Sequence, residues 1–72
     1  MSGRPFDFLQ NAIGKNVVVS LKGQQKVRGE FASYDVHLNI VLKNAEVLEN
    51  NEVVEKHPVL LVRGDSIILI SL

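Results

Sequence analysis

The chain has 72 residues, no cysteine, and eight Lys or Arg against eight Asp or Glu. The length allows one domain, and the lack of cysteine excludes disulfides and thiolate metal sites as sources of stability. A formal net charge of zero excludes a broad basic surface, so any nucleic-acid binding must come from a local group of residues. We predict a single domain over residues 1–72 that is stabilised by partner subunits.

A short helix is the first predicted element, over residues 4–13. Pro5 suits a first helical turn, because the N–H that it lacks would have no partner there. Phe6, Leu9 and Ile13 form an apolar stripe at helical spacing, which predicts packing against the rest of the domain. Gly14 favours the end of the helix.

From about residue 16 the apolar period changes to two, which indicates strands. Turn residues at Lys22–Gln24 and Glu49–Asn51 separate them. Gly29, inside the second strand, predicts a bend or a close approach of two backbones. A third strand is predicted to include Leu38, and a fourth is expected to be interrupted near Pro58. The fold class that follows is all-β with a short N-terminal helix: a strongly bent five-stranded barrel over residues 16–72, connected as a meander.

The last predicted strand, residues 66–72, is apolar on both faces. Alternation would place Ile67 and Leu69 on one face and Ile68 and Ile70 on the other. Such a strand is an aggregation risk if it stays a free edge. Pairing with a neighbouring copy, head to tail, would cover it and could close into a ring. We therefore predict a ring-forming homo-oligomer.

Two segments carry a family resemblance. The first leads from Gly29 into DVHLNIVL at residues 35–42, and the second is VLLVRGDSIILI at residues 59–70. Each segment alone is a weak signal of a family. Both segments in this order, each at the expected end of a strand, form a specific signal. With the helix they resemble the Sm/LSm family over essentially the whole chain. The short length looks most like an archaeal Sm-like protein, whereas bacterial relatives typically carry Tyr-Lys-His where this chain has Val62–Gly64.

The resemblance implies an Sm-like (SH3-like) barrel in a ring, most often a homo-heptamer, with a hexamer also possible. It implies a non-enzymatic subunit that binds single-stranded U-rich RNA around a central pore, without a cofactor. The expected role is RNA processing, RNA chaperoning or ribonucleoprotein assembly in the cytoplasm. The alternative function is a structural scaffold ring with little or no RNA binding.

The chemistry of the first motif suits a uracil base. His37 can stack on one face of the base, and the Arg63 guanidinium plane can cover the other. The Asn39 amide has a donor and an acceptor, which match a carbonyl and the imino N–H of uracil. Asp35 is predicted to lie on the same side and to orient that amide. The alternative without ligand binding is that Asp35, His37 and Asn39 are ordinary turn residues.

The second motif adds supporting residues. Asp65 can hold Arg63 by a charge-assisted bond, and Gly64 is expected to leave its backbone N–H accessible, or to supply a positive φ. By resemblance, Arg4 and Tyr34 are possible residues of a second RNA contact on the face that carries the helix.

Other functional classes find little support in the sequence. His37 and Asp35 have no Ser or Cys nucleophile in a recognisable context, which argues against a hydrolase. The histidines at 37 and 57 do not have a zinc-site spacing, so no metal is expected. No apolar run approaches the roughly 20 residues that a membrane span needs. The N-terminus lacks the apolar segment of a signal peptide.

Overall fold

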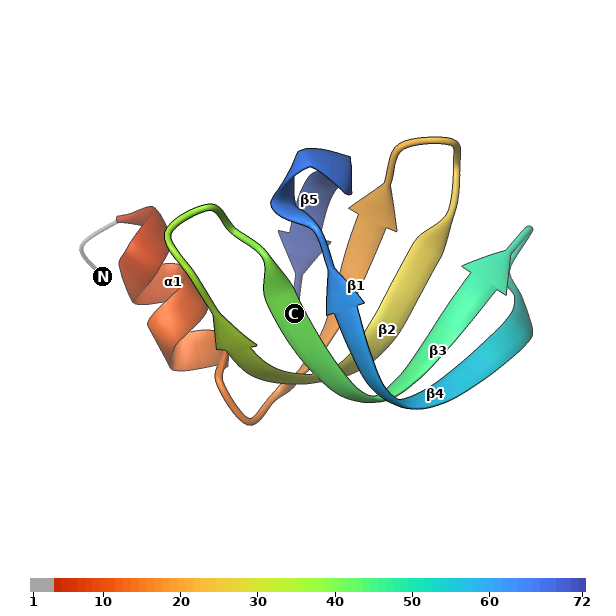
Figure 1. Ribbon diagram of the computed structural model, residues 1–72, viewed down its shortest axis with the longest axis horizontal. Helices are drawn as coiled ribbons and strands as arrows, with labels where there is room; N and C mark the ends of the chain where they lie inside the picture. Colours follow the sequence, from red (N-terminus) through yellow and green to blue (C-terminus); the bar gives the residue numbers. More distant parts are fainter. Residues whose placement is uncertain (1–3) are drawn as a thin grey trace.

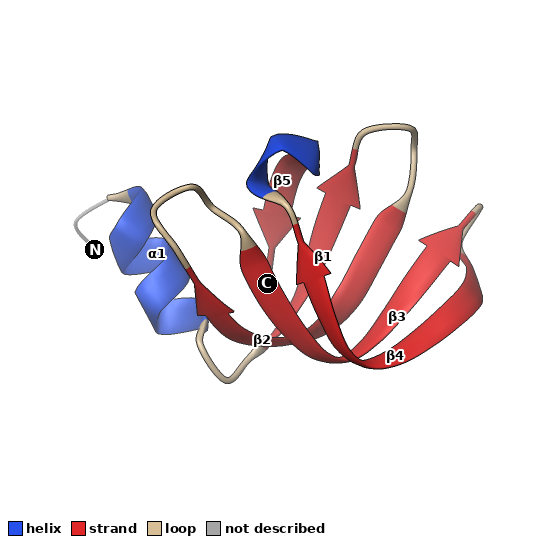
Figure 2. Cartoon of the chain, viewed as in Figure 1, coloured by secondary structure: helices blue, strands red, loops and turns tan. Residues whose placement is uncertain are grey.

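The computed structural model describes residues 4–72 and consists of a short helix and a bent sheet (Figures 1 and 2). The elements are α1 (Pro5–Ala12), β1 (Asn16–Leu21), β2 (Lys26–Tyr34), β3 (Ile40–Glu49), β4 (Glu52–Val62), a 3-10 turn η1 (Gly64–Ser66) and β5 (Ile67–Ser71). The predicted fold class is confirmed. Residues 1–3 of the predicted domain lie outside the described residues.

The five strands form one antiparallel sheet in the order β4-β3-β2-β1-β5. The first four strands follow a meander, but β5 returns to pair with β1, so the prediction of a simple five-stranded meander is wrong. Val18 lies opposite Ser71, and the Lys22 N–H donates to the Ser66 carbonyl (3.0 Å), which ties η1 to the end of β1. As a result β4 and β5 are the two edges of the sheet.

The sheet bends sharply along its three longest strands, β2, β3 and β4, as Figure 1 shows. A Cβ at Gly29 would lie 2.9 Å from the Lys43 carbonyl oxygen, so β2 and β3 approach too closely there for any side chain. Asn44 beside them has a φ of 50°, and the β2–β3 register shifts at this point. The bend predicted at Gly29 is confirmed. β4 runs unbroken through Pro58, so the predicted interruption there is wrong, since an edge strand tolerates a missing N–H that faces away from the ladder. The bend also expected near Pro58 is present, because Pro58 lies opposite Asn44, between the pairs Lys43–Val59 and Ala45–His57.

The core fills the inside of the bend and reaches under α1. Its largest fully buried side chains are Phe31, Ile40, Leu42, Val17 and Val19. They alternate along β1, β2 and β3, as strands with one buried face require. Burying side chains of this size contributes about 1.5–3 kcal/mol each.

The helix contributes a different face from the predicted one. Leu9 and Ala12 are buried, whereas Phe6 and Ile13 are 52% and 39% exposed. The helix ends at Ala12, so Ile13 is already a non-helical cap residue and leaves the helical face. Phe6 instead stacks on Tyr34 at the outer edge of the core.

The faces predicted for the last strand are also wrong in part. Ile67 and Ile70 both pack against the core, while Ile68 and Leu69 are 63% and 52% exposed. The cause is a β-bulge: Ile67 pairs with Leu21, yet Leu69 pairs with the preceding β1 residue. Ile68 is the extra residue, and it shifts the alternation by one position.

Candidate nucleic-acid interface

The loop between β2 and β3 carries most of the predicted site. It is a tight turn in which the Leu38 N–H donates to the Asp35 carbonyl (3.0 Å) and the Asp35 N–H to the Asn39 carbonyl (3.1 Å). Leu38 has a φ of 61° and is 41% exposed, so the prediction that it belongs to a strand is wrong. His37 and Asn39 are therefore placed by the turn and not by the alternation of a strand.

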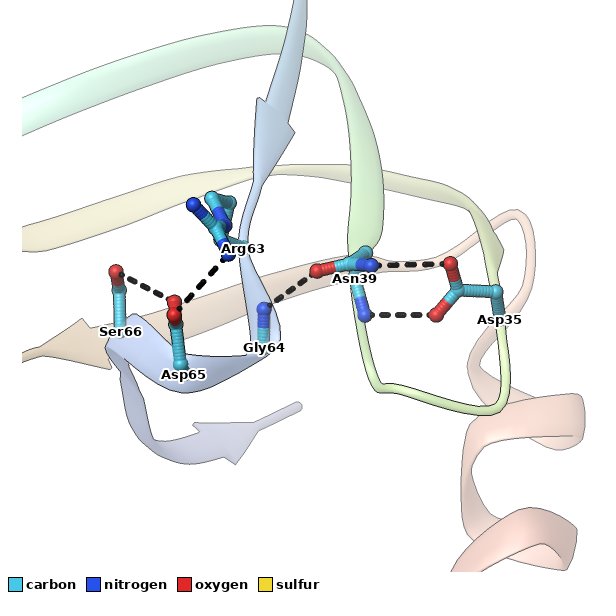
Figure 3. A network of polar contacts seen from close by, with 6 residues as sticks. All are labelled: Asp35, Asn39, Arg63, Gly64, Asp65 and Ser66. Carbon is cyan, nitrogen blue, oxygen red and sulfur yellow. Dashed lines mark hydrogen bonds and ion pairs between the residues drawn. The ribbon is translucent and has the colours of Figure 1, made fainter.

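The Asp35 carboxylate organises this loop. Its Oδ1 accepts from the backbone N–H groups of His37 (2.9 Å) and Asn39 (3.0 Å), and its Oδ2 accepts from the Asn39 side-chain Nδ2 (3.1 Å; Figure 3). These bonds, led by the one from the Asn39 side chain, hold the pKa of Asp35 below its ordinary value. Asp35 is therefore ionised at neutral pH and acts only as an acceptor.

The other end of the Asn39 amide is held by the second motif. The Gly64 N–H donates to Asn39 Oδ1 at 2.9 Å, across 25 positions of sequence (Figure 3). The prediction that this N–H is accessible is therefore wrong. A Cβ at Gly64 would collide with the His37 carbonyl oxygen, and the φ of Gly64 is not positive. Glycine is required here because two loops touch, which sequence reasoning missed.

Arg63 and Asp65 lie on the outer side of the second loop. Arg63 Nη2 is 3.3 Å from Asp65 Oδ2, and the two side chains are 75% and 66% exposed. Such an exposed ion pair is weak and contributes up to about 1 kcal/mol. His37 is exposed on the first loop. We call residues 35–39 and 63–66 the slot loops; the Asn39–Gly64 bond docks one loop on the other.

Tyr34 and Arg4 belong to a different part of the surface. The ring of Tyr34 stacks against Phe6 (centroids 6.1 Å apart) and Phe31 (5.9 Å), and its hydroxyl donates to Gln10 (3.3 Å). Arg4 is the N-cap residue of α1. Tyr34 therefore packs α1 onto the sheet, and the structure does not place it among the slot loops.

Comparison with known proteins identifies the family. The family model of the LSM domain matches residues 7–72, which is nearly the whole chain. The chain belongs to the LSM family. This LSM protein is 46% identical over 71 residues to a protein of Methanosarcina acetivorans that is described as snRNP Sm-like, and the match covers 99% of both chains.

Solved structures agree with that assignment. An Sm protein of Pyrococcus abyssi, solved in complex with a uridine heptamer, is 40% identical, with a TM-score of 0.92 over 94% of this chain and 96% of that one. A heptameric archaeal Sm protein is 37% identical, with a TM-score of 0.84 over 90% of this chain and 94% of that one. The fold of this LSM protein is thus the Sm fold.

Within residues 4–72 no helix has the length and apolar character to cross a membrane. The same residues include no group of three or more His, Cys, Asp or Glu side chains arranged to hold a metal ion.

Proposed function

We propose that this LSM protein is a non-enzymatic ring subunit that binds single-stranded, uridine-rich RNA. The observation that carries the proposal is the Asn39 amide, held at Oδ1 by Gly64 and at Nδ2 by Asp35. An amide has two N–H donors and two oxygen lone pairs, so one of each remains for a ligand. Uracil presents the complementary pair, a carbonyl oxygen beside an imino N–H.

Stacking supplies the second part of the proposed site. His37 and Arg63 are both exposed, and they stand on two loops that the Asn39–Gly64 bond joins. An imidazole and a guanidinium can each cover one face of a base, and Asp65 would hold the guanidinium in place. Each stacked base contributes about 1–3 kcal/mol, so a single slot binds weakly.

Ring assembly would turn weak slots into tight binding. Val59 and Leu61 on edge strand β4 are 61% and 63% exposed, and Ile68 and Leu69 on edge strand β5 are 63% and 52% exposed. Pairing β4 of one copy with β5 of the next would cover both edges and repeat around a closed ring. We propose a homo-heptamer, as in the archaeal Sm relative, with a hexamer as the other closed ring. Slots repeated along one strand raise the avidity steeply.

The wider role follows from the same features. We assign the protein to RNA processing, RNA chaperoning or ribonucleoprotein assembly in the cytoplasm, with residues 1–72 as one domain. The absence of cysteine fits a reducing compartment. A second RNA contact through Arg4 and Tyr34, on the face that carries α1, is part of the proposal. Arg4→Ala should weaken binding of long RNA more than binding of short oligo-U.

The direct test is a fluorescence-anisotropy titration with oligo-U, oligo-C and oligo-A, together with the particle mass in the same buffer. We expect a ring of seven subunits, or six, that prefers oligo-U. A ring that binds none of the three RNAs would refute RNA binding and leave a scaffold ring as the function.

Substitutions in the slot locate the binding. His37→Ala, Asn39→Ala and Arg63→Ala should each weaken oligo-U binding at least tenfold, because each removes about 1–3 kcal/mol of contact per base. Native mass spectrometry should show the ring intact in all three. Glu49→Gln is the matched control, since it removes an exposed charge at the end of β3, outside both the slot loops and the edge strands. Unchanged oligo-U affinity in the three slot variants would place the RNA elsewhere.

A further inference from the structure

We infer that the outside of the bent sheet binds an acidic, partly apolar segment of a partner protein, at a site separate from the proposed uridine slot. Two hollows lie there, with volumes of about 410 and 460 Å³. The first is lined mainly from β1 and β2 and the second from β4, while Asn44 and Glu46 of β3 line both, so the hollows are neighbours. Neither hollow is lined by a residue of the slot loops.

The first hollow combines a cation with apolar walls. The Nε of Arg28 lies 2.7 Å from Glu46 Oε1, and the Arg28 side chain is still 50% exposed. A guanidinium has five N–H donors, so its terminal nitrogens remain able to bind a second carboxylate. Val18 and Leu72 supply apolar side chains beside it, and Asn44 adds an exposed amide. The hollow therefore suits a ligand that carries a carboxylate next to an apolar group.

Positive charge is in excess on this side of the sheet. On β2, β3 and β4 the residues that alternate with the buried ones point away from the core. The charged members of this set, which we call the outer face, are four cations and two anions: Lys26, Arg28, Lys43, Lys56, Glu30 and Glu46. The whole chain is neutral, so the surplus of two positive charges is balanced by anions elsewhere. The outer face thus complements an acidic partner.

The anions of the outer face determine which kind of acidic partner fits. Glu46 lies between Arg28 and Lys56, 2.7 and 3.8 Å from their nitrogens. RNA has a negative charge at every nucleotide, so a strand that crosses this row would bring a phosphate against Glu46, and like charges brought together are costly. A peptide can place one carboxylate at Arg28 and apolar side chains in the hollows, because its charges are spaced by its sequence. The outer face therefore favours a protein segment over RNA.

The position of Arg28 in the sheet keeps this site available in a ring. In the strand order β4-β3-β2-β1-β5, Arg28 stands on the middle strand, away from both edges proposed for assembly. At about 3.3 Å per residue, it is also roughly 20 Å along β2 from the start of the slot turn. Each subunit would then hold RNA at its slot and a protein segment on its outer face. A partner with several such segments gains avidity from the repeated sites.

The test begins with a phage-displayed library of random dodecapeptides, panned on the assembled wild-type protein with and without oligo-U. We expect the enriched peptides to carry Asp or Glu beside large apolar residues, and to be the same in both panning experiments. The enriched peptides are then synthesised with a fluorophore, and their affinity is measured by anisotropy. Enrichment without an acidic residue would overturn the inference, because nothing would then pair with Arg28.

Two substitutions of opposite effect locate the peptide. Arg28→Gln should weaken its binding at least about tenfold, because a charge-assisted pair with the peptide carboxylate is lost. Glu46→Gln should strengthen binding roughly threefold, because it removes the carboxylate that competes for Arg28 and Lys56. Lys22→Gln is the matched control: it also removes one exposed positive charge, but in the β1–β2 turn and outside both hollows, so the peptide affinity should stay unchanged.

Measurements of RNA affinity on the same variants separate this site from the slot. Oligo-U affinity should be the same in wild type, Arg28→Gln and Glu46→Gln. If Arg28→Gln loses binding of oligo-A or oligo-C and keeps that of the peptides, RNA is the occupant of the outer face and the inference is wrong. Peptide affinity that is equal in wild type and Arg28→Gln would place the peptides elsewhere and overturn it as well. If Arg28→Gln does not fold, Glu46→Gln decides: tighter peptide binding supports the inference, and unchanged or weaker binding refutes it.

Discussion

The slot loops and the edge strands are both exposed, but they differ in how far a single chain satisfies their bonding groups. In the slot loops the polar groups of Asp35, Asn39 and Gly64 are joined by hydrogen bonds within the chain. Within residues 4–72 the edges β4 and β5 have no strand partner on their outer sides, and they expose large apolar side chains. The proposed base selectivity therefore belongs to one subunit, whereas tight binding depends on several.

The largest effect is expected from a substitution on an edge strand. Ile68→Asp would place a charge in the proposed contact between subunits, at a cost of roughly 3 kcal/mol or more, which weakens association at least a hundredfold. Light scattering should show monomers or partial rings, and oligo-U affinity should collapse although the slot is untouched. Gln24→Asp is the control, because Gln24 is exposed in the turn between β1 and β2, outside both the edge strands and the slot loops. Rings that persist in Ile68→Asp would place the interface elsewhere.

A smaller effect is expected where the two slot loops meet. Gly64→Ala puts a methyl group against the His37 carbonyl, and the loops must separate. Forced contacts of this kind cost about 1–3 kcal/mol, which urea denaturation can measure as a loss in the free energy of unfolding. Oligo-U binding should fall with it, while Ser33→Ala, at an exposed position of β2 outside the slot loops, should change neither. Wild-type stability and binding in Gly64→Ala would show that the loops have room to adjust.

Within the slot, the outer ion pair should matter less than the inner amide. Asp65→Ala removes the partner of Arg63 in a pair that is mostly exposed, so oligo-U affinity should fall by only about 0.2–1 kcal/mol. Titrations at low and high salt check the cause, since the difference from wild type should shrink as salt screens the pair. A loss as large as that of Arg63→Ala would mean that Asp65 contacts RNA itself.

The smallest expected effect is a change in the pKa of Asp35 within the slot loops. Asn39→Ala removes the largest cause of the lowered pKa of Asp35, so that pKa should rise toward its ordinary value of 3.8, as NMR titration of the carboxyl group can measure. A lowered folded-state pKa means stability that is present above pH 3.8 and is lost as the pH falls through the folded value. Above pH 3.8 the titration of Asp35 should have no effect on the slot. If the pKa of Asp35 does not change, its lowering must come from the hydrogen bonds that the backbone N–H groups donate.

The local pattern of the sequence predicted most of the fold. Alternation of buried residues such as Val17 and Val19 predicted the strands, and Asn50 and Asn51 predicted the hairpin turn that both adopt with positive φ. The pairing of β5 with β1 was not predictable in this way, because alternation says nothing about which strand lies alongside. The bulge at Ile68 was missed for the same reason, since it exists only relative to β1.

The candidate site was predictable in composition but not in its contacts. Residue types suggested that Asp35 orients Asn39, and the structure contains that hydrogen bond. The bond between Gly64 and Asn39 joins two loops that only the bent sheet brings together, so no spacing rule indicates it. The roles of His37 and Arg63 toward a base remain predictions of the proposed function.

The return of β5 to β1 has a consequence for how the protein is made. A ribosome produces β5 after the other four strands, so a nascent chain stopped before residue 67 has the slot turn at Asp35–Asn39 but lacks one of the two edges proposed for assembly. Its β1 is also left uncovered on one side. Such a fragment could pair its β4 with the β5 of a complete subunit, but it has no β5 with which a further subunit could pair. If the ring closes through β4 and β5, only chains that have reached β5 can take part in closing it.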